Sequence, residues 1–482
     1  MRLLDLTVLL IYLLGTLGFG LWIGRRSKNS IDFTTGGGRL PSWALGLSIF
    51  GTYVSAFSFL ALPGKSFDSN WNFFAFSLTI PLLAWVAVVW LVPFYRNLGN
   101  ISAYEHLEKR FGPWARLYAV ACYLFIQLGR MGGILYLLAV ALQPVTGLSI
   151  PALIILAAAI VIVYTFFGGM EAVVWTDVVQ SVVLIGGALT CAVLILFKLP
   201  DGPAQLFQIA GDHEKLSLGS FDFDLTKSTI WIVLLFGLFE NLRNFGADQS
   251  YIQRYQSART SREAANSVWL GALLYLPVSA IFFFIGTGLF AYYEVHPELL
   301  PAGLADQPDK VFPHFIATAL PIGVAGLLIA GVAAAAQSTI SSSLNCGATL
   351  LLNDVYHRFI DRHASEQKSL AVLRFTTIGY GILGTATALA MIQVKTALDL
   401  WWQIAGIFGG GILGIILLGR LTRATSAQAA IATILGVFLI GGRSLFPDHV
   451  LPFFHPLFTI VLGTLGILGS GWILAALFPA RR

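Results

Sequence analysis

The stretch AAAAQSTISSSLN, residues 333–345, is the most informative part of this chain. It places five hydroxyl side chains within the six positions 338–343, inside a segment that is otherwise apolar from Pro321 to Leu352. A helix that is apolar on all sides lies in a large protein core or in a membrane. Hydroxyls gathered on such a helix need either partners on neighbouring helices or a ligand.

The composition of the whole chain is that of a polytopic membrane protein. Only 11% of its 482 residues are charged, against roughly 25% in soluble domains. Mean hydropathy is +0.79, and no soluble domain is visible. Apolar stretches near the ~20 residues that cross a bilayer recur along the entire length. They predict thirteen spans, at 4–24, 41–64, 73–95, 115–142, 150–168, 172–198, 228–250, 267–293, 315–352, 371–394, 396–419, 425–442 and 454–478.

The distribution of Lys and Arg predicts the orientation. When the loops are sorted alternately, one side receives nineteen basic residues, Arg254 among them, and the other side receives eight. Short cytoplasmic loops carry the excess of positive charge. We therefore expect the N-terminus outside and the C-terminus in the cytoplasm, in a cytoplasmic (inner) membrane of bacterial type. The net charge of +5 follows from this asymmetry and gives no reason to expect a nucleic-acid partner.

Two spans contain features that are typical of interrupted helices. The first, residues 44–64, carries Gly51, Thr52, Ser55 and Ser58 and is expected to end at Pro63-Gly64; the second, residues 231–250, carries Gly237, Glu240, Asn241, Arg243, Asn244 and Gly246. Paired interrupted spans in the two halves of an inverted repeat indicate the central binding site of a transporter. We predict one all-α transporter domain over 1–482, with an extra span at 4–24, five-helix repeats at 41–198 and 228–419, and two final spans within 425–478.

The hydroxyl stretch can form an ion site. On a helix, Ser338, Ser341 and Ser342 stand at i, i+3 and i+4, so they share one face, with Ala335 and Thr339 at its edges. Oxygen ligands without nitrogen or sulfur suit alkali and alkaline-earth ions, and sodium is the natural candidate. The alternative is close helix packing, with the serines bonded back to their own helix.

Three charged positions inside spans allow more than one interpretation. Asp177 can add a negative ligand to the hydroxyl face or cap a helix N-terminus. Glu240 and Arg243, at i and i+3, can form an internal salt bridge. Arg130 lies in the middle of a span, where its planar guanidinium can bind the carboxylate of an anionic substrate. It can also pair with Glu240 or with backbone carbonyls.

Several function classes find no support in the sequence. GGG at 36–38 has no following Lys-Ser or Lys-Thr, so it is a weak phosphate-binding motif, and there is no zincin helix and no nucleophile elbow. We therefore expect neither an enzyme nor an ATP-driven pump, and no cofactor or nucleotide. A membrane sensor is a remote alternative, because the chain ends at Arg482 directly after its last span without a signalling domain.

Five motifs resemble the sodium:solute symporters, the relatives of the sodium/glucose cotransporters, and most closely the bacterial sodium/sialic acid symporters. These motifs are GGGRLPSWALGLSIF, SAYEHLEKRFG, YTFFGGMEAVVWTDVVQ, LLPAG and AAAAQSTISSSLN. The resemblance covers nearly the whole chain. It implies the inverted-repeat fold of the leucine transporter and alternating-access symport, with sodium as a co-transported ligand.

The same resemblance implies the residues of three sites. One sodium site falls on Gly51, Val54, Ala335, Ser338 and Thr339, and a second falls on Asp177, Ser338, Ser341 and Ser342. Substrate contacts fall on Tyr53, Ser55, Ser58, Phe73, Ser77, Arg130 and Asn241.

Two of the substrate positions depart from the pattern of the sialic acid relatives. Tyr53 replaces a small hydroxyl residue and Ser77 replaces a glutamine, and Glu240 adds an acid beside the pocket. We expect a sodium-coupled importer of sialic acid (N-acetylneuraminate) or a related sugar acid. A neutral sugar is the alternative substrate.

Overall fold

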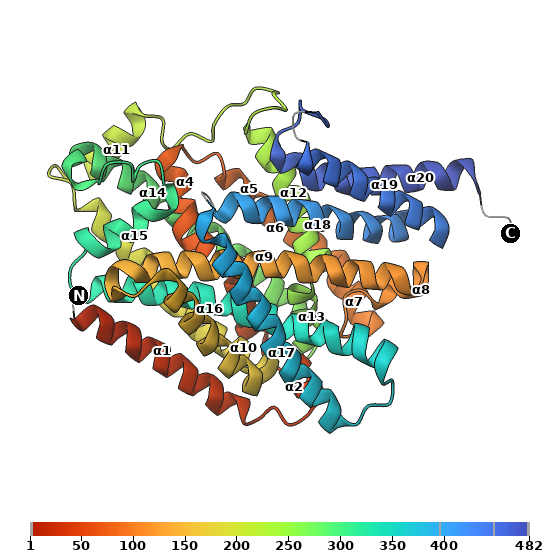
Figure 1. Ribbon diagram of the computed structural model, residues 1–482. Coiled ribbons are helices and arrows are strands. Elements are labelled where there is room, and N and C mark those ends of the chain that lie inside the picture. The colour runs from red at the N-terminus through yellow and green to blue at the C-terminus, as the bar shows by residue number, and fades with distance from the viewer. Residues whose placement is uncertain (1–2, 395–396, 447–448, 480–482) are drawn as a thin grey trace.

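The computed structural model describes residues 3–394, 397–446 and 449–479 and builds them almost entirely from helices (Figure 1). Within these ranges, extended backbone pairs at one bridge, between Leu40 and Ala258. Arg2, Lys395, Arg481 and Arg482, which entered the charge count, lie outside the described residues, as does Thr396 at the start of a predicted span.

The described part of the first half of the chain contains the helices α1 (Leu3–Gly24), α2 (Ser30–Thr35), α3 (Ser42–Tyr53), α4 (Leu62–Asp68), α5 (Phe74–Leu78), α6 (Ile80–Val86), α7 (Val92–Leu98), α8 (Glu105–Phe111), α9 (Pro113–Thr146) and α10 (Ile150–Leu196). The rest contains α11 (Pro203–Asp212), α12 (Ile230–Ala247), α13 (Gln249–Ser257), α14 (Ser261–Val295), α15 (Pro308–Ala319), α16 (Val324–Leu350), α17 (Glu366–Ala390), α18 (Ala397–Leu421), α19 (Ser426–Leu445) and α20 (Thr459–Leu477). Three π-helical segments, η2 (Phe57–Ala61), η3 (Ala87–Leu91) and η5 (Leu351–Ile360), continue some of these helices.

The number of spans depends on how α10 is counted. Among the described residues, eleven helices are long and apolar enough to cross a membrane, or twelve with the bent pair that begins with α3. α10 has 47 residues, which at 1.5 Å per residue is about 70 Å, more than twice the bilayer core. Its backbone leaves helical geometry at Gly169, where φ is 57°. α10 therefore comprises the two spans predicted at 150–168 and 172–198, which brings the total to the predicted thirteen.

The span predicted at 315–352 has the wrong start. Residues 315–319 belong to α15, and α16 begins only at Val324. Gly323 has a φ of 88°, which separates the two helices although the apolar sequence runs on across the turn. Hydropathy alone does not register such a break.

Both interruptions exist; the first falls within the predicted polar stretch 51–58, and the second lies just after Gly246, the last of the residues that suggest it. α3 ends at Tyr53, and the next helical segment begins at Phe57, bent by 57°. The helix then runs through Pro63-Gly64 to Asp68, because proline is tolerated in a first helical turn. α12 is continuous through Gly237 and Gly246 and ends at Ala247. The break lies at Asp248, whose side chain caps α13 by accepting a hydrogen bond from the Ser250 amide.

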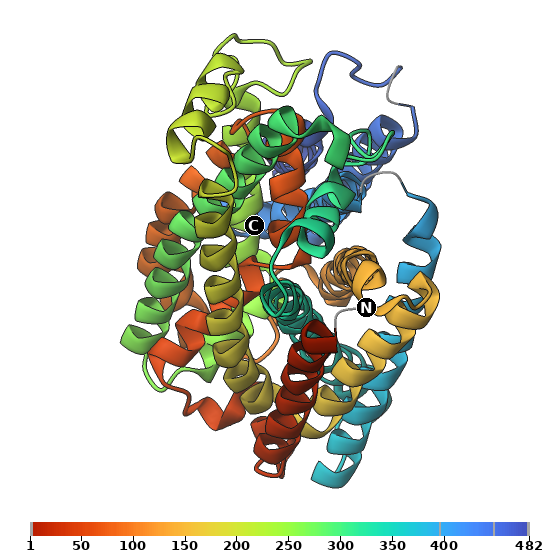
Figure 2. The same cartoon turned by 90° about the vertical axis from the view of Figure 1, so that its left-hand side faces the viewer.

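α16 lies in the centre of the bundle. The most apolar stretch of Val324–Ile360 is 89% buried, whereas that of α1 is only 22% buried. In Figure 2, α9 (orange) and α16 (teal) are seen nearly end-on among the surrounding helices. Figure 1 shows α1 along one edge and α19 and α20 toward the opposite edge. The helix that carries the hydroxyl stretch is thus surrounded by protein and not by lipid.

Candidate ion and solute sites

The hydroxyl helix meets the first interrupted helix at Gly51. A Cβ atom at Gly51 would lie 2.7 Å from Ser338 Oγ, so only glycine permits this approach of α3 to α16. The other members of the first predicted sodium site, Val54, Ala335 and Thr339, are at most 1% exposed. Two distant parts of the chain, 51–54 and 335–339, therefore both lie in the buried centre and touch at Gly51 and Ser338.

Asp177 binds the hydroxyl helix directly. Its Oδ1 accepts a hydrogen bond from Ser338 Oγ at 2.6 Å, and its Oδ2 accepts one from the Ser48 hydroxyl on α3. Asp177 is fully buried and lies eight positions beyond the break at Gly169, within α10. The interpretation of Asp177 as a helix cap is therefore wrong.

The five hydroxyls divide between the two functions that the sequence allows. Thr339 and Ser341 donate to backbone carbonyls of their own helix, and Ser343 lies within hydrogen-bond distance of both the Thr339 carbonyl and Gln127 Oε1 on α9. Ser338 and Ser342 instead face other elements. Of the second predicted sodium site, the structure therefore groups Ser338 and Ser342 around Asp177 and leaves the Ser341 hydroxyl bonded to the Ser338 carbonyl at 3.1 Å.

A cation of the protein itself lies where the second sodium site is predicted. The guanidinium of Arg254, on α13, lies 3.1 Å from Asp177 Oδ2 and donates to Ser342 Oγ at 2.7 Å and to Ser48 Oγ at 2.8 Å. Arg254 and Asp177 are both 0% exposed. The charge count placed Arg254 in a cytoplasmic loop, and this was wrong. Its sequence neighbourhood, QRYQ at 253–256, is polar and gave no signal of burial.

A small cavity lies at the break of the first interrupted helix, between α3 and the segment that begins at Phe57. It encloses about 60 Å³, room for about two water molecules. Six of the seven predicted substrate residues line it, namely Tyr53, Ser55, Ser58, Phe73, Ser77 and Arg130. The seventh, Asn241, lies behind Tyr53 and accepts a hydrogen bond from its hydroxyl at 3.2 Å. Sequence reasoning missed several aromatic residues of the lining, among them Trp401, Trp402, Tyr251 and Tyr275.

Arg130 carries an uncompensated charge beside this cavity. Among the described residues no carboxylate pairs with it; its Nη2 donates to the Thr52 carbonyl at 2.5 Å, and its buried Nε has no partner. The guanidinium lies over the Trp401 ring, 5.6 Å from the ring centroid. The predicted bond to a backbone carbonyl is present, and the alternative pairing with Glu240 is wrong.

Glu240 is held by Arg243. The Glu240 carboxylate accepts from Arg243 Nε at 3.0 Å and from Nη2 at 2.5 Å, which confirms the predicted internal salt bridge. Arg243 also binds Asp248 at 3.1 Å, at the break between α12 and α13. This buried triad holds one guanidinium and two carboxylates, so its formal net charge is −1, and both carboxylates are bonded to Arg243 and not to Arg130.

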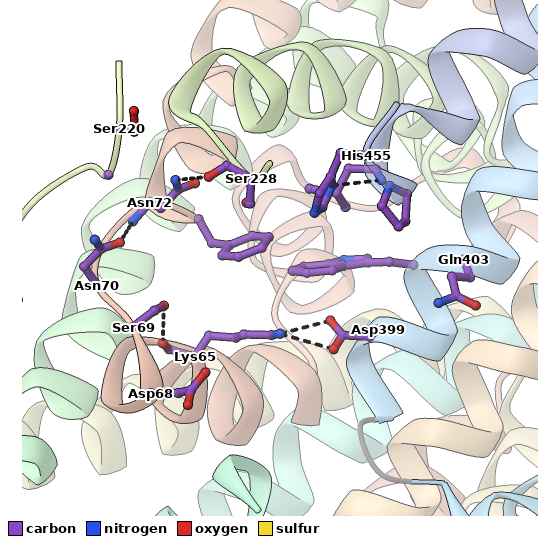
Figure 3. A pocket seen from close by; sticks show the side chains of 15 residues that line it. Lys65, Asp68, Ser69, Asn70, Asn72, Ser220, Ser228, Asp399, Gln403 and His455 are labelled. Atoms are coloured by element: carbon purple, nitrogen blue, oxygen red, sulfur yellow. Dashed lines mark hydrogen bonds and ion pairs between the residues drawn. The ribbon is translucent and has the colours of Figure 1, made fainter. Parts of the chain in front are cut away.

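One end of the cavity is closed by an ion pair and two stacked rings. Lys65 on α4 reaches Asp399 on α18, at 3.1 Å (Figure 3). Phe73 and Trp402 stack with centroids 5.0 Å apart, and both rings line the small cavity and a larger vestibule of about 560 Å³. The rings therefore form the wall between the two spaces.

The other side is closed by hydrogen bonds between α13 and its neighbours. Gln253 on α13 donates to Asn345 on α16 at 2.8 Å and to the Thr34 carbonyl. The Leu40 amide, just before α3, donates to the Ser257 carbonyl at the end of α13, at 3.1 Å. The small cavity is thus shut from both ends.

Comparison with known proteins identifies this architecture. Residues 33–436 match the family model described as the Sodium:solute symporter family. The chain belongs to that family. It is 34% identical to the sodium/sialic acid symporter SiaT of Proteus mirabilis (strain HI4320), over 99% of this chain and 96% of SiaT. It is also 34% identical to the sodium/sialic acid symporter NanT of Aliivibrio fischeri (strain ATCC 700601 / ES114), over 98% and 93% of the two chains.

The fold agrees with that of a solved symporter. A substrate-bound, outward-open structure of a Na⁺-coupled sialic acid symporter is 33% identical, covers 99% of both chains and superposes with a TM-score of 0.92. The predicted leucine-transporter-like fold is therefore confirmed. The protein is a multi-pass membrane transporter that couples solute movement to sodium, and it is not an enzyme.

Proposed function

We propose that this symporter imports a sugar acid of the sialic acid type, with Arg130 holding the carboxylate of the solute. The observation that carries the proposal is the buried guanidinium of Arg130, which has no carboxylate partner among the described residues and borders the central cavity. A buried charge without a partner is costly, so a site that keeps one is matched to an ion of opposite sign. The two relatives named above are sodium/sialic acid symporters, which supports the same solute class.

The departures at Tyr53 and Ser77 change the shape of the pocket and not its charge. The Tyr53 ring packs against Phe245, Tyr251 and Tyr275, with centroids 5.1–5.7 Å apart. The Ser77 hydroxyl bonds to Ser279 at 2.7 Å. Neither residue supplies a charge, so both alter which polar substituents of the solute fit, while the carboxylate requirement rests with Arg130.

We propose that sodium binds in two places. The first comprises Gly51, Val54, Ala335, Ser338 and Thr339, where α3 meets α16; the second comprises Asp177, Ser338, Ser341 and Ser342. Because the Arg254 guanidinium bonds to Asp177 and Ser342, a sodium ion at the second site must displace it. Ser338 belongs to both sites and bonds to Asp177, so a change at one site moves a ligand of the other.

This arrangement couples the ions to the solute. Sodium held between 51–54 and 335–339 fixes the end of α3, and residues 53–58 of the same break line the solute cavity. Ion and solute therefore each favour the conformation that the other binds. We place the N-terminus outside and the C-terminus in the cytoplasm of a bacterial inner membrane. Each sodium then gains about 2.3 kcal/mol per 100 mV on entering.

Uptake into proteoliposomes tests the proposal. Wild-type protein, R130A and a surface control, R362Q, are compared with sialic acid, a second sugar acid and a neutral hexose, each with and without a sodium gradient. We expect sodium-dependent uptake of the acids only. Removing one partner of a buried charged contact costs about 2–5 kcal/mol, so R130A should weaken acid binding by roughly 30-fold or more. If the wild type takes up the hexose and R130A retains that uptake, the proposal of an anionic solute is refuted.

A further inference from the structure

The cytoplasmic-side end of α1 borders a hollow that carries excess positive charge. The hollow encloses about 700 Å³ and is lined by Arg25, Arg26, Lys28, Asp32, Gly36, Arg39, Leu40, Pro41, Glu171, Trp175 and Arg259. We call it the basic hollow. It includes the start of the GGG motif at 36–38, which the transport function does not use. Five cationic side chains face two carboxylates there.

The two carboxylates are already engaged. Glu171 pairs with Arg26 at 3.3 Å, and Asp32 pairs with Arg39 at 3.2 Å. Arg25, Lys28 and Arg259 have no carboxylate partner among the described residues. Some basic residues elsewhere on this side are neutralised: Arg116 binds Glu108 and Asp354, and Arg358 binds Glu108. The membrane orientation requires positive charge on this side, but it does not require that the charges converge on one hollow.

Apolar side chains surround the basic hollow on the lipid side. Trp22 is 53% exposed, Trp43 is 49% exposed and Ile31 is 56% exposed. Exposed tryptophans are typical of the headgroup level of a bilayer, and the Arg26 guanidinium lies over the Trp22 ring at 5.2 Å. Phe167, two residues before the bend of α10 at Gly169, is also exposed. A ligand of the hollow can therefore place a charged group among the cations and apolar chains along α1 and α10.

We infer that the basic hollow binds the headgroup of an anionic phospholipid from the cytoplasmic leaflet. Basic pockets between membrane helices on the cytoplasmic side suit such headgroups, and a phosphate accepts bonds from several Arg and Lys donors at once. The assignment of the leaflet rests on the proposed orientation. The binding itself rests on the charges and exposed apolar residues.

The position of the hollow gives the lipid a role in transport. The Arg259 guanidinium donates to the Arg39 carbonyl at 2.9 Å, beside the contact of Leu40 with Ser257 and Ala258. That contact joins the start of α3 to the end of α13 and closes the inner side. A phosphate between the two arginine side chains removes their mutual repulsion, so the lipid should stabilise the inward-closed state.

Native mass spectrometry and melting curves in a neutral detergent test the inference without reference to orientation. The probes are phosphatidylglycerol, phosphatidylcholine and inorganic phosphate. We expect retained phosphatidylglycerol and a raised melting temperature, with neither effect from the other two. The variant R25Q/K28Q removes two exposed cations without partners. Since each cation near an anionic surface contributes about a fivefold factor, the variant should weaken phosphatidylglycerol binding about thirtyfold.

The control variant R362Q/R423Q removes two exposed basic residues of the same side that do not line the hollow. It should retain phosphatidylglycerol as the wild type does. An equal loss in both variants would show that basic residues attract the anionic lipid without a specific site in the hollow, and an equal shift with inorganic phosphate would show a free-anion site; either result would overturn the inference. If the wild-type protein retained phosphatidylglycerol equally well with and without added choline chloride, the inference would also be overturned, because an electrostatic headgroup site would be excluded. A wrong orientation would change none of these results.

Discussion

The strongest test of the ion sites is the substitution Arg254→Gln. In the wild type, the Arg254 guanidinium bonds to Asp177, Ser342 and Ser48, all at most 2% exposed. If sodium binds at Asp177, it must break these bonds first. Glutamine removes the competing charge and leaves Asp177 with the Ser338 and Ser48 hydroxyls.

Two opposite effects should follow. Without sodium, the R254Q protein should lose about 3–5 kcal/mol of stability, because one member of a buried ion pair is gone. With sodium, the ion takes the place of the guanidinium. Hydrogen bonds that involve a charged group contribute about 1.5–3 kcal/mol each. In R254Q, sodium no longer has to break the bonds of Arg254. If this removes the cost of even one such bond, the sodium concentration for half-maximal stabilisation should be at least about tenfold lower than in the wild type.

Melting curves over a sodium titration, with choline chloride keeping the ionic strength constant, measure both effects. The matched control is R116Q, which also removes a buried arginine, from Glu108 and Asp354. R116Q should be destabilised in a similar way, with an unchanged sodium dependence. D177N should lose the sodium response of the second site. A half-maximal sodium concentration in R254Q that equals or exceeds that of the wild type would refute the competition.

Three further changes probe the rest of the framework. G51A places a Cβ 2.7 Å from Ser338 Oγ, so it should lower the free energy of unfolding by about 1–3 kcal/mol and weaken sodium binding, both measured by melting curves over a sodium titration. The control is G186A, where nothing lies within 4 Å of the added Cβ. K65Q breaks a half-exposed ion pair, so stability should change by less than about 1 kcal/mol, while exchange of bound solute with the outside, measured by counterflow, should become faster. Asp309 lies in α15, outside the spans, and burial together with the Asp399 charge raises its pKa to about 6. Between about pH 4 and 6 the folded protein holds a proton on Asp309 that the unfolded chain has released, so this group makes the free energy of unfolding fall as pH rises. The D309N variant should lack that fall and should be up to about 3 kcal/mol more stable than the wild type at pH 7.5. Equal melting temperatures of D309N and the wild type at pH 7.5 would contradict the assignment.

The fold was predictable because bilayer physics acts on composition. Span positions follow from apolar length, and even the two spans fused in α10 were predicted as separate segments, 150–168 and 172–198, on either side of Gly169. The errors arose where backbone geometry decides. Gly323 ends the turn before α16 inside an apolar run, and Asp248 breaks α12 from α13 just beyond the polar cluster that suggested an interruption. A capping side chain and a positive φ act over one or two residues, below the resolution of a hydropathy pattern.

The site was predictable to the extent that chemistry is local in sequence. The spacing of Ser338 and Ser342 predicted that they share a face, and both lie near Asp177, whereas Ser341 at the same spacing bonds back to its own helix. Arg130 was singled out by its position in a span. Arg254 was not predictable in this way, because its neighbours Gln253 and Gln256 are polar and a basic residue near a span end normally marks a cytoplasmic loop. Its burial depends on tertiary contacts with α3, α10 and α16, which no single segment encodes.

The burial of Arg254 also explains why Asp177 can lie inside the bundle at all. A fully buried carboxylate needs a cation, and each candidate cation in the centre is committed differently: Arg243 to Glu240 and Asp248, Arg130 to the solute cavity, and Arg254 to Asp177. In the absence of sodium, Arg254 keeps Asp177 neutralised and holds α13 against α3, α10 and α16. If sodium binds at Asp177, as we propose, the same guanidinium must find new partners, and α13 belongs to the second interrupted helix, whose hydrogen bonds close one end of the cavity. On this proposal, ion exchange at one carboxylate loosens that closure, because Arg254 lies on the helix that makes it.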